Sequence, residues 1–243
     1  MIAVFLKELN TFFSSLVGYI SVIVFLLGMG MFVWIFPDTN VLDYGFTTLD
    51  TLFSSSPWIF MFLIPAITMR SFSEELSSGT FELLATRPLK DSSIIMGKYL
   101  AAVTLVIFAL LPTLIYFYSL QQLGSPPGNI DAGATWGSYI GLILLGSSFV
   151  SIGIFSSSIT KNQVVAFVIA VFLCFLIFIA FDFISKMNIF YAKIDDLVES
   201  LGINYHYISI SRGVLDTRDL LYFISLNALF LLMTKLSIES RKW

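Results

Sequence analysis

Long runs without a charged residue are the feature that most limits what this 243-residue chain can fold into. A membrane-spanning helix needs about 20 mostly apolar residues. Five uncharged runs are long enough: Leu9–Pro37, Thr51–Met69, Tyr99–Ile130, Ala132–Thr160 and Asn162–Phe181. A sixth run, Leu220–Thr234, is shorter, but Lys235 lies one turn from its end and can direct its amine to the interface, so this helix can extend to Ile238. The sequence therefore predicts six membrane spans.

Composition excludes the main alternatives to a membrane protein. Hydrophobic residues make up 57% of the chain and charged residues only 12%, about half the usual share of charge. A soluble protein of this length cannot bury so much apolar surface, so a soluble enzyme or a nucleic-acid binder is excluded. The same composition excludes a disordered chain, and a net charge of −3 offers no basic patch for nucleic acid.

The expected architecture is an all-α integral membrane protein with six transmembrane helices, preceded by an amphipathic interfacial helix at the N-terminus. The predicted spans are residues 17–36, 52–70, 97–119, 136–159, 163–184 and 219–238. No internal repeat or soluble region is visible, so residues 1–243 are expected to form a single transmembrane domain.

The distribution of lysine and arginine predicts the orientation. Nine of these residues fall in the N-terminus, the second and fourth connections and the C-terminus, and four fall in the 185–218 loop. The nine are Lys7, Arg70, Arg87, Lys90, Lys98, Lys161, Lys235, Arg241 and Lys242. Because cytoplasmic segments carry the excess of positive charge, both termini are expected to be cytoplasmic and residues 185–218 to form an extracytoplasmic loop.

Residues 1–16 form an amphipathic segment. Apolar residues recur at spacings of three or four, with polar residues between them: Ile2, Phe5, Leu6, Leu9, Phe12, Phe13 and Leu16. This pattern predicts a helix that lies in the membrane interface. It could be a simple anchor, or it could also move with a partner, and the spacing does not decide between the two.

The 71–96 loop is the most polar cytoplasmic stretch, and its residues suggest a local plan. Ser71 and Glu74 have the spacing of a capping box, which would start a helical turn, and Gly79 would end it. Thr80 can cap a second short helix that Arg87-Pro88 ends. One short helix over residues 81–86 is therefore expected below the membrane.

Phe81 and Leu84 would share one face of that short helix. Apolar side chains on a cytoplasmic loop suggest a docking surface for another protein. They could equally fold back onto the inner ends of spans two and three, and spacing alone leaves both interpretations open.

The same residues resemble a known family. Glu75, followed by Gly79-Thr80-Phe81-Glu82, Leu84 and then Arg87-Pro88, is similar to the signature that follows the second span of ABC-2 type permeases. The amphipathic helix of residues 1–16, which we call the lead helix, is part of the same resemblance. The six spans and the long segment between spans five and six extend it over the whole chain. Within the family, the length and the opening residues resemble the gliding-motility-associated permease subunits.

The resemblance implies a role for each part of the loop. The short helix would be the coupling helix that inserts into a cytoplasmic ABC ATPase dimer, and residues 1–16 would be the connecting helix. The implied ATPase-coupling residues are Glu75, Gly79, Thr80, Phe81, Glu82, Leu84 and Arg87. A second permease subunit with a large periplasmic domain, membrane lipid and a location in the bacterial inner membrane are implied as well.

The chain itself shows no nucleotide site or catalytic site. It has no phosphate-binding loop of the Gly-x-x-x-x-Gly-Lys-Ser/Thr type, so ATP and Mg²⁺ are expected on a separate ATPase subunit. No cofactor, metal site or catalytic residue is assigned, because the one histidine, His206, has no Cys, Asp or Glu at ligand spacing. The chain is therefore expected to be a non-catalytic subunit.

Small residues repeat in span four and suggest close helix packing. Gly137 and Gly141 are one turn apart, as are Ser147 and Ser151. Such spacing lets helices approach closely. Packing within the six-helix bundle is the favoured interpretation, and a seam with a second permease is the alternative.

The 185–218 loop mixes aromatic and acidic residues, and Ile194, Leu197, Val198 and Leu201 recur at helical spacing. An interfacial helix that covers the outer end of the bundle is expected there. Contact with a periplasmic partner is the alternative.

Three functional alternatives accompany an ATP-driven permease. An ion- or proton-coupled carrier or channel would need charges in mid-span, broken helices or inverted repeats. An intramembrane enzyme would need clustered acids, a Ser/His pair or metal ligands. A mechanical or assembly complex, which the gliding-motility resemblance suggests, would look the same from the sequence as a transporter.

Overall fold

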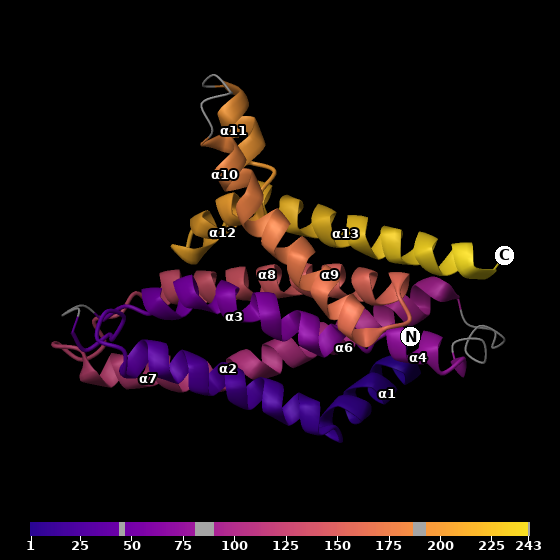
Figure 1. Cartoon of the computed structure of the whole chain (residues 1–243). Coiled ribbons are helices and arrows are strands. Elements are labelled where there is room, and N and C mark those ends of the chain that lie inside the picture. Colours follow the sequence, from indigo (N-terminus) through magenta and orange to yellow (C-terminus); the bar gives the residue numbers. More distant parts are fainter. Residues whose placement is uncertain (44–46, 81–89, 187–192, 243) are drawn as a thin grey trace.

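The structure is a computed structural model that describes residues 1–43, 47–80, 90–186 and 193–242. All regular elements in these ranges are helices, as predicted (Figure 1). Five helical segments are long and apolar enough to cross a membrane: Asp50–Ser77, Asp91–Leu123, Ala132–Ile159, Gln163–Ser185 and Thr217–Glu239. A sixth candidate span results if α1 (Ile2–Phe13) and α2 (Leu16–Trp34) are counted together as one bent span. The axes of this pair differ by 68°.

The central helix is α8 (Ala132–Ile159), which packs against most of the others. Of the 18 most apolar consecutive residues of α8, 78% are buried. The corresponding share is 28% for the segment Gln163–Ser185 and for α13 (Thr217–Glu239). Around it lie α3 (Asp50–Thr68), α6 (Asp91–Leu110), α9 (Gln163–Phe175) and α13. Its many glycines and serines allow this central position, because small side chains let backbones approach closely.

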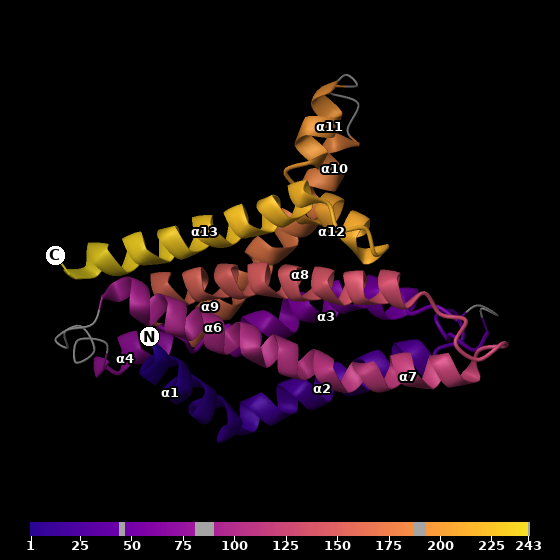
Figure 2. The same cartoon turned by 180° about the vertical axis from the view of Figure 1, so that it is seen from behind.

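Two spans change their helical geometry along their length. The third continues from α6 through a 3₁₀ turn at Leu111–Thr113 into α7 (Leu114–Leu123). Pro112 lies in that turn, where it cannot donate a backbone hydrogen bond. The fifth passes from α9 through a π-helical stretch, Leu176–Ala180, into α10 (Phe181–Ser185). Together with α11 (Lys193–Glu199), α10 stands away from the remaining helices (Figures 1 and 2).

The bundle has two distinct ends. We call the end that carries Met1, α4 (Ser73–Ser77) and the end of α13 the near end. The opposite end, with α12 (Ile203–Ser211) and the start of α13, is the far end. Two hydrogen bonds fasten the near end: the Ser237 hydroxyl donates to the Ser158 carbonyl at 3.2 Å, and the Arg241 guanidinium donates to the Ile159 carbonyl.

The 185–218 loop contains two helices, α11 and α12. Helix α11 lies where a covering helix was expected, but it stands away from the bundle together with α10 and does not cover it (Figures 1 and 2). Helix α12 is the one that lies against the bundle. It packs into the bundle through Ile203, Tyr207 and Ile210, which are buried. The Tyr207 hydroxyl donates a hydrogen bond of 2.6 Å to the Phe53 carbonyl in α3. Burial raises the pKa of Tyr207, so its hydroxyl keeps the proton that makes this bond.

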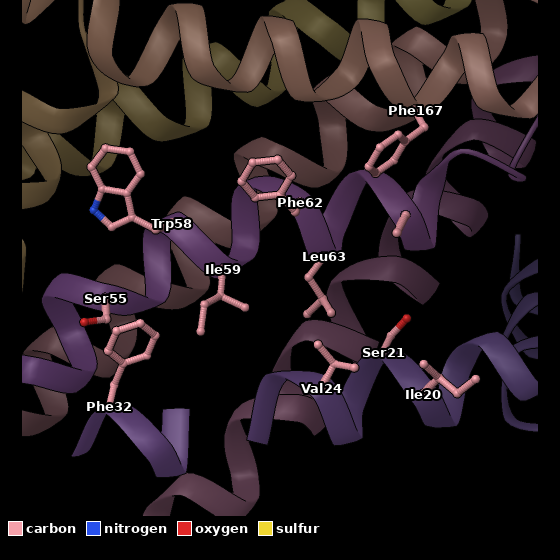
Figure 3. A pocket seen from close by; sticks show the side chains of 11 residues that line it. Ile20, Ser21, Val24, Phe32, Ser55, Trp58, Ile59, Phe62, Leu63 and Phe167 are labelled. Atoms are coloured by element: carbon pink, nitrogen blue, oxygen red, sulfur yellow. The ribbon is translucent and has the colours of Figure 1, made fainter. Parts of the chain in front are cut away.

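Much of the lateral surface is apolar. A cavity of about 610 Å³ opens between α2, α3 and α9, and aromatic side chains line it (Figure 3). Trp58 and Phe62 of α3 lie on one side, Val24 of α2 on another, and Phe167 belongs to α9. Hydrocarbon can cover such a surface without leaving polar groups unsatisfied, which agrees with a membrane environment.

Candidate functional site

The site begins where α3 turns into α4 at the near end. The backbone N–H groups of Phe72 and Ser73 donate to the Ser157 hydroxyl oxygen at 2.9 and 3.0 Å. The same hydroxyl donates to the Met69 carbonyl at 2.9 Å. One side chain of α8 thus satisfies the backbone on both sides of the turn.

This arrangement corrects the predicted capping box. The residue that precedes α4 is Phe72, and no side-chain cap bonds the first turn. Ser71 does not cap the helix, because the Ser73 N–H already bonds to Ser157 of α8 and the Glu74 N–H bonds to the Arg70 carbonyl. A long-range hydroxyl therefore replaces the local cap.

Glu75, which is itself buried, is the centre of an ionic cluster. It is 9% exposed, and its Oε1 lies 3.1 Å from the Lys7 amine and 3.0 Å from the Lys98 amine. Lys7 belongs to α1 and Lys98 to α6, so one carboxylate joins three elements. Glu8 completes the set, with its Oε1 at 2.8 Å from the Lys98 amine. We call Lys7, Glu8, Glu75 and Lys98 the lead-helix cluster.

Lys98 is almost fully buried, yet its amine is both hydrogen-bonded and ion-paired. The amine lies near Glu8 and Glu75, and it donates to the Ser71 carbonyl at 2.6 Å. It also lies 5.0 Å from the centroid of the Phe72 ring, within range of a cation–π interaction. A buried ammonium is tolerated only when it is paired and hydrogen-bonded, and Lys98 meets both conditions.

Lys7 shows the electrostatic strength of the cluster. Burial would lower the pKa of its amine, but the hydrogen bond to Glu75 and the negative charges of Glu75 and Glu8 outweigh burial and raise it. The two lysines and two glutamates sum to zero charge. Loss of any one member therefore leaves an unbalanced charge at the junction of α1, α4 and α6.

The lead helix approaches α6 closely beside Lys98. A Cβ atom added to Gly97 would lie 3.0 Å from the Val4 Cβ and 3.1 Å from the Met1 carbonyl oxygen. Val4 is buried, whereas Ile2 and Leu6 are exposed. The face of α1 that carries Val4, Lys7 and Glu8 is thus turned to the bundle. Much of the predicted apolar stripe is turned outward.

The loop leaves this cluster through Gly79. Helix α4 ends at Ser77, and Gly79 has a φ of +70°, the left-handed conformation expected of a glycine that follows a helix. The exposed Thr80 hydroxyl shares a hydrogen bond of 2.9 Å with the Ser78 hydroxyl. Four implied coupling residues, Phe81, Glu82, Leu84 and Arg87, lie outside the described residues, as does the predicted short helix.

A cavity of about 320 Å³ lies between α1 and the α4 region. Charged side chains of both signs line it, including the lead-helix cluster, Arg70 and Glu74. The exposed Ser78 and Thr80 also line the cavity, so it reaches the start of the undescribed segment. The cluster and the loop that leads to the predicted coupling helix therefore share one surface.

The small residues of α8 lie inside the chain's own bundle. Gly137 faces the backbone of Gly213, where an added Cβ would lie 2.8 Å from the Gly213 carbonyl oxygen. Gly141 faces Ile210 of α12 in the same way. The Ser147 hydroxyl accepts a hydrogen bond of 2.9 Å from the side-chain amide of Asn227 in α13. Ser151 is buried and donates to the Ser148 carbonyl within α8.

The sequence pattern points to Glu75 but not to its partners. In the sequence, Lys7 and Lys98 indicate only the orientation, and Glu8 has no distinguishing feature. One signal was available: Lys98 directly precedes the uncharged run of span three, which places a charge where the helix is entering the apolar layer. In the described part of the chain, no three or more His, Cys, Asp or Glu side chains are grouped so that they could hold a metal ion.

Comparison with known proteins identifies the family. A search of curated proteins found no match. The family model described as ABC-2 family transporter protein matches residues 2–238, nearly the whole chain. The all-helical fold and its five or six candidate spans agree with this match. The chain therefore belongs to the ABC-2 family of transporter proteins, as a multi-pass transmembrane subunit of an ABC transporter.

Proposed function

We propose that this permease couples ATP hydrolysis on a separate cytoplasmic ABC ATPase dimer to conformational work across the membrane, through the 71–96 loop. The observation that carries the proposal is the lead-helix cluster. It fastens α1, α4 and α6 together beside Gly79 and Thr80, where the chain enters the predicted coupling helix.

Both ends of the loop are fixed to the bundle. Before residue 81, the loop is held by Ser157 and by the paired Glu75. After residue 89 it continues directly into α6, where Lys98 returns to the same cluster. A push on the intervening segment would therefore reach α3, α6 and the lead helix together rather than dissipate in a loose loop. In this proposal α1 is the connecting helix that moves with the loop.

The orientation is part of the proposal. Lys7, Arg70, Lys98 and Lys161 lie on near-end elements, and the C-terminal Arg241 lies there too. The positive-inside tendency supports a cytoplasmic near end. ATP and Mg²⁺ would bind to the partner ATPase, and a bacterial inner membrane and a second permease subunit with a large periplasmic domain complete the proposed assembly. Participation in gliding motility would be one use of such a complex.

A gradient-driven carrier or channel receives less support. Such proteins place charged residues near the middle of the membrane. Among the described residues, the buried acidic, basic and histidine side chains are Glu75, Lys98, His206 and Asp219. The first two belong to the near end and the last two to the far end, so they do not form a path through the middle.

Substitution of Phe81 tests the proposal. Phe81→Asp places a charge on the apolar face of the predicted coupling helix, so we expect weaker co-purification with the cognate ATPase and a lower ATPase rate in the reconstituted complex. Leu123→Asp is the matched control, because Leu123 is exposed at the end of α7, on the far end. Unchanged assembly and unchanged ATPase rate in Phe81→Asp would refute the proposed coupling.

A further inference from the structure

A buried histidine–carboxylate pair lies at the far end, more than 100 residues from the lead-helix cluster in sequence. His206 of α12 is 9% exposed and Asp219 in the first turn of α13 is 6% exposed. The His206 Nδ1 lies 2.7 Å from the Asp219 Oδ1, and the His206 Nε2 lies 2.9 Å from the Ser200 carbonyl oxygen. Ser200 directly follows α11, so one imidazole ring joins three helical segments.

The hydrogen-bond partners dictate how many protons the pair must hold. A backbone carbonyl can only accept, so Nε2 must carry a proton and donate it to Ser200. An ionised carboxylate can also only accept, so a proton must lie between Nδ1 and Asp219 as well. Both contacts are therefore satisfied by an imidazolium with a carboxylate, or equally by a neutral imidazole with a carboxylic acid. Without that second proton, two lone pairs face each other at one of the contacts.

The surroundings favour the ionised arrangement. Asp219 lies in the first turn of α13, where the helix dipole stabilises negative charge. The Tyr222 ring stacks on the imidazole with centroids 4.0 Å apart, a position that suits a cation. Tyr205 meets the ring edge-on at 5.2 Å. In the described part of the chain, Asp219 is the acidic residue that forms an ion pair with His206.

Other titratable or charged groups on the elements around the pair are more distant contributors to its field. They are Tyr207 and Arg212 on or after α12, Asp216 and Arg218 at the start of α13, Asp195 and Glu199 of α11, Asp182 and Lys186 at α10, Tyr139 of α8 and Asp50 of α3. Asp216 accepts a hydrogen bond of 2.9 Å from the Arg218 backbone N–H, and the Lys186 amine lies 2.8 Å from Asp182.

We propose that Ser200, His206 and Asp219 form a proton latch that holds the end of α11 and α12 against α13 while it is protonated, and releases them when its proton passes to the surrounding water. In this way acidity on the far side of the membrane would keep α12 and the end of α11 packed against α13. The latch is independent of the proposed coupling to an ATPase, because its contacts lie entirely within the far end.

Hydrogen exchange of residues 203–211, corrected for intrinsic rates, tests the latch in the full chain in lipid nanodiscs. The useful range is about pH 5 to 9, which brackets histidine titration. If release of the segment also releases the proton, protection should fall as pH rises, by at most about tenfold per pH unit, which is the limit for one linked proton. Constant protection across the range would overturn the proposal.

Two variants separate the latch from general effects of pH. Asp219→Asn should make protection vary less than about twofold, because an amide can donate to a neutral Nδ1 while Nε2 still donates to Ser200. Asp216→Asn is the matched control, since asparagine caps helices as well as aspartate does, and it should keep the wild-type slope. The proposal fails if the slope of Asp219→Asn equals that of the wild type.

A spectroscopic measurement needs no variant, because His206 is the only histidine of the chain. Nitrogen-15 NMR of selectively labelled histidine reports the protonation of both ring nitrogens directly. We expect the Nδ1 signal to change over the same pH interval in which protection is lost. A change of protection without a change of Nδ1 would overturn the latch.

Discussion

Replacement of Glu75 by glutamine should detach the lead helix from the bundle. The variant keeps the shape of the side chain but removes the charge that holds the Lys7 amine at 3.1 Å and the Lys98 amine at 3.0 Å. The charge of the lead-helix cluster changes from zero to +1, and the buried Lys98 keeps Glu8 and the Ser71 carbonyl as partners.

The magnitude follows from the exposure of each partner. Breaking a fully buried ion pair costs about 3–5 kcal/mol, and exposed pairs contribute about 0–1 kcal/mol. The Lys98 side chain is 2% exposed and retains Glu8, whereas the Lys7 side chain is 56% exposed. The loss in the free energy of unfolding should therefore be about 2–4 kcal/mol, below the sum of two buried pairs.

The assay combines denaturant unfolding in detergent with hydrogen exchange of residues 2–13. Glu74→Gln is the matched control, because Glu74 is exposed, lines the same cavity and makes no ion pair in the described part of the chain. We expect faster exchange of α1 in Glu75→Gln and near wild-type behaviour in the control. If the two variants have the same stability and the same exchange, the cluster does not hold the lead helix.

Three further predictions concern the near end. Ser157→Ala should lower the free energy of unfolding by about 1–3 kcal/mol, because two backbone N–H groups at the start of α4 lose their partner. Ser156→Ala is the control, because the Ser156 hydroxyl bonds only within α8, and it should lower the free energy of unfolding by less in the same experiment. Gly97→Val should displace the lead helix from α6, because Val4 occupies the space beyond Gly97. A lower yield of a disulfide cross-link engineered between α1 and α6 would report this displacement. The pKa of Lys7 is raised, so its contribution is complete below its ordinary value of about 10.5 and is lost only as pH rises through the higher folded value. Exchange of residues 2–13, corrected for intrinsic rates, should therefore stay constant from about pH 6 to 9, and a change over that range would contradict the assignment.

The spans could be predicted because a charge in hydrocarbon is costly, so uncharged runs mark them directly. All six predicted spans correspond to helical segments in the structure, with ends that differ by several residues. The residue pattern alone does not mark helix α12, for a physical reason. Its nine residues mix buried apolar side chains with Asn204, His206 and Ser209, and no uncharged run of spanning length draws attention to it.

The ionic cluster could be predicted only in part. Glu75 stood out through the family resemblance, but its partners are 68 residues away at Lys7 and 23 residues away at Lys98, and local pattern carries no information on such pairings. The same holds for Ser157, which replaced the predicted capping box from 85 residues away. The sequence does not reveal the latch pair, because Asp219 is 13 residues from His206, a separation that matches no ligand spacing on one helix.

Site-directed photo-cross-linking from Thr80 tests the central claim most directly. Thr80 is exposed at the near end, immediately before the predicted coupling helix, and Ser125 is exposed in the loop that follows α7 at the far end. With the cognate ATPase present in membranes, a photoreactive residue at position 80 should form an adduct with the ATPase, and one at position 125 should not. An ATPase adduct from position 125, or none from position 80 in an assembled complex, would contradict the account.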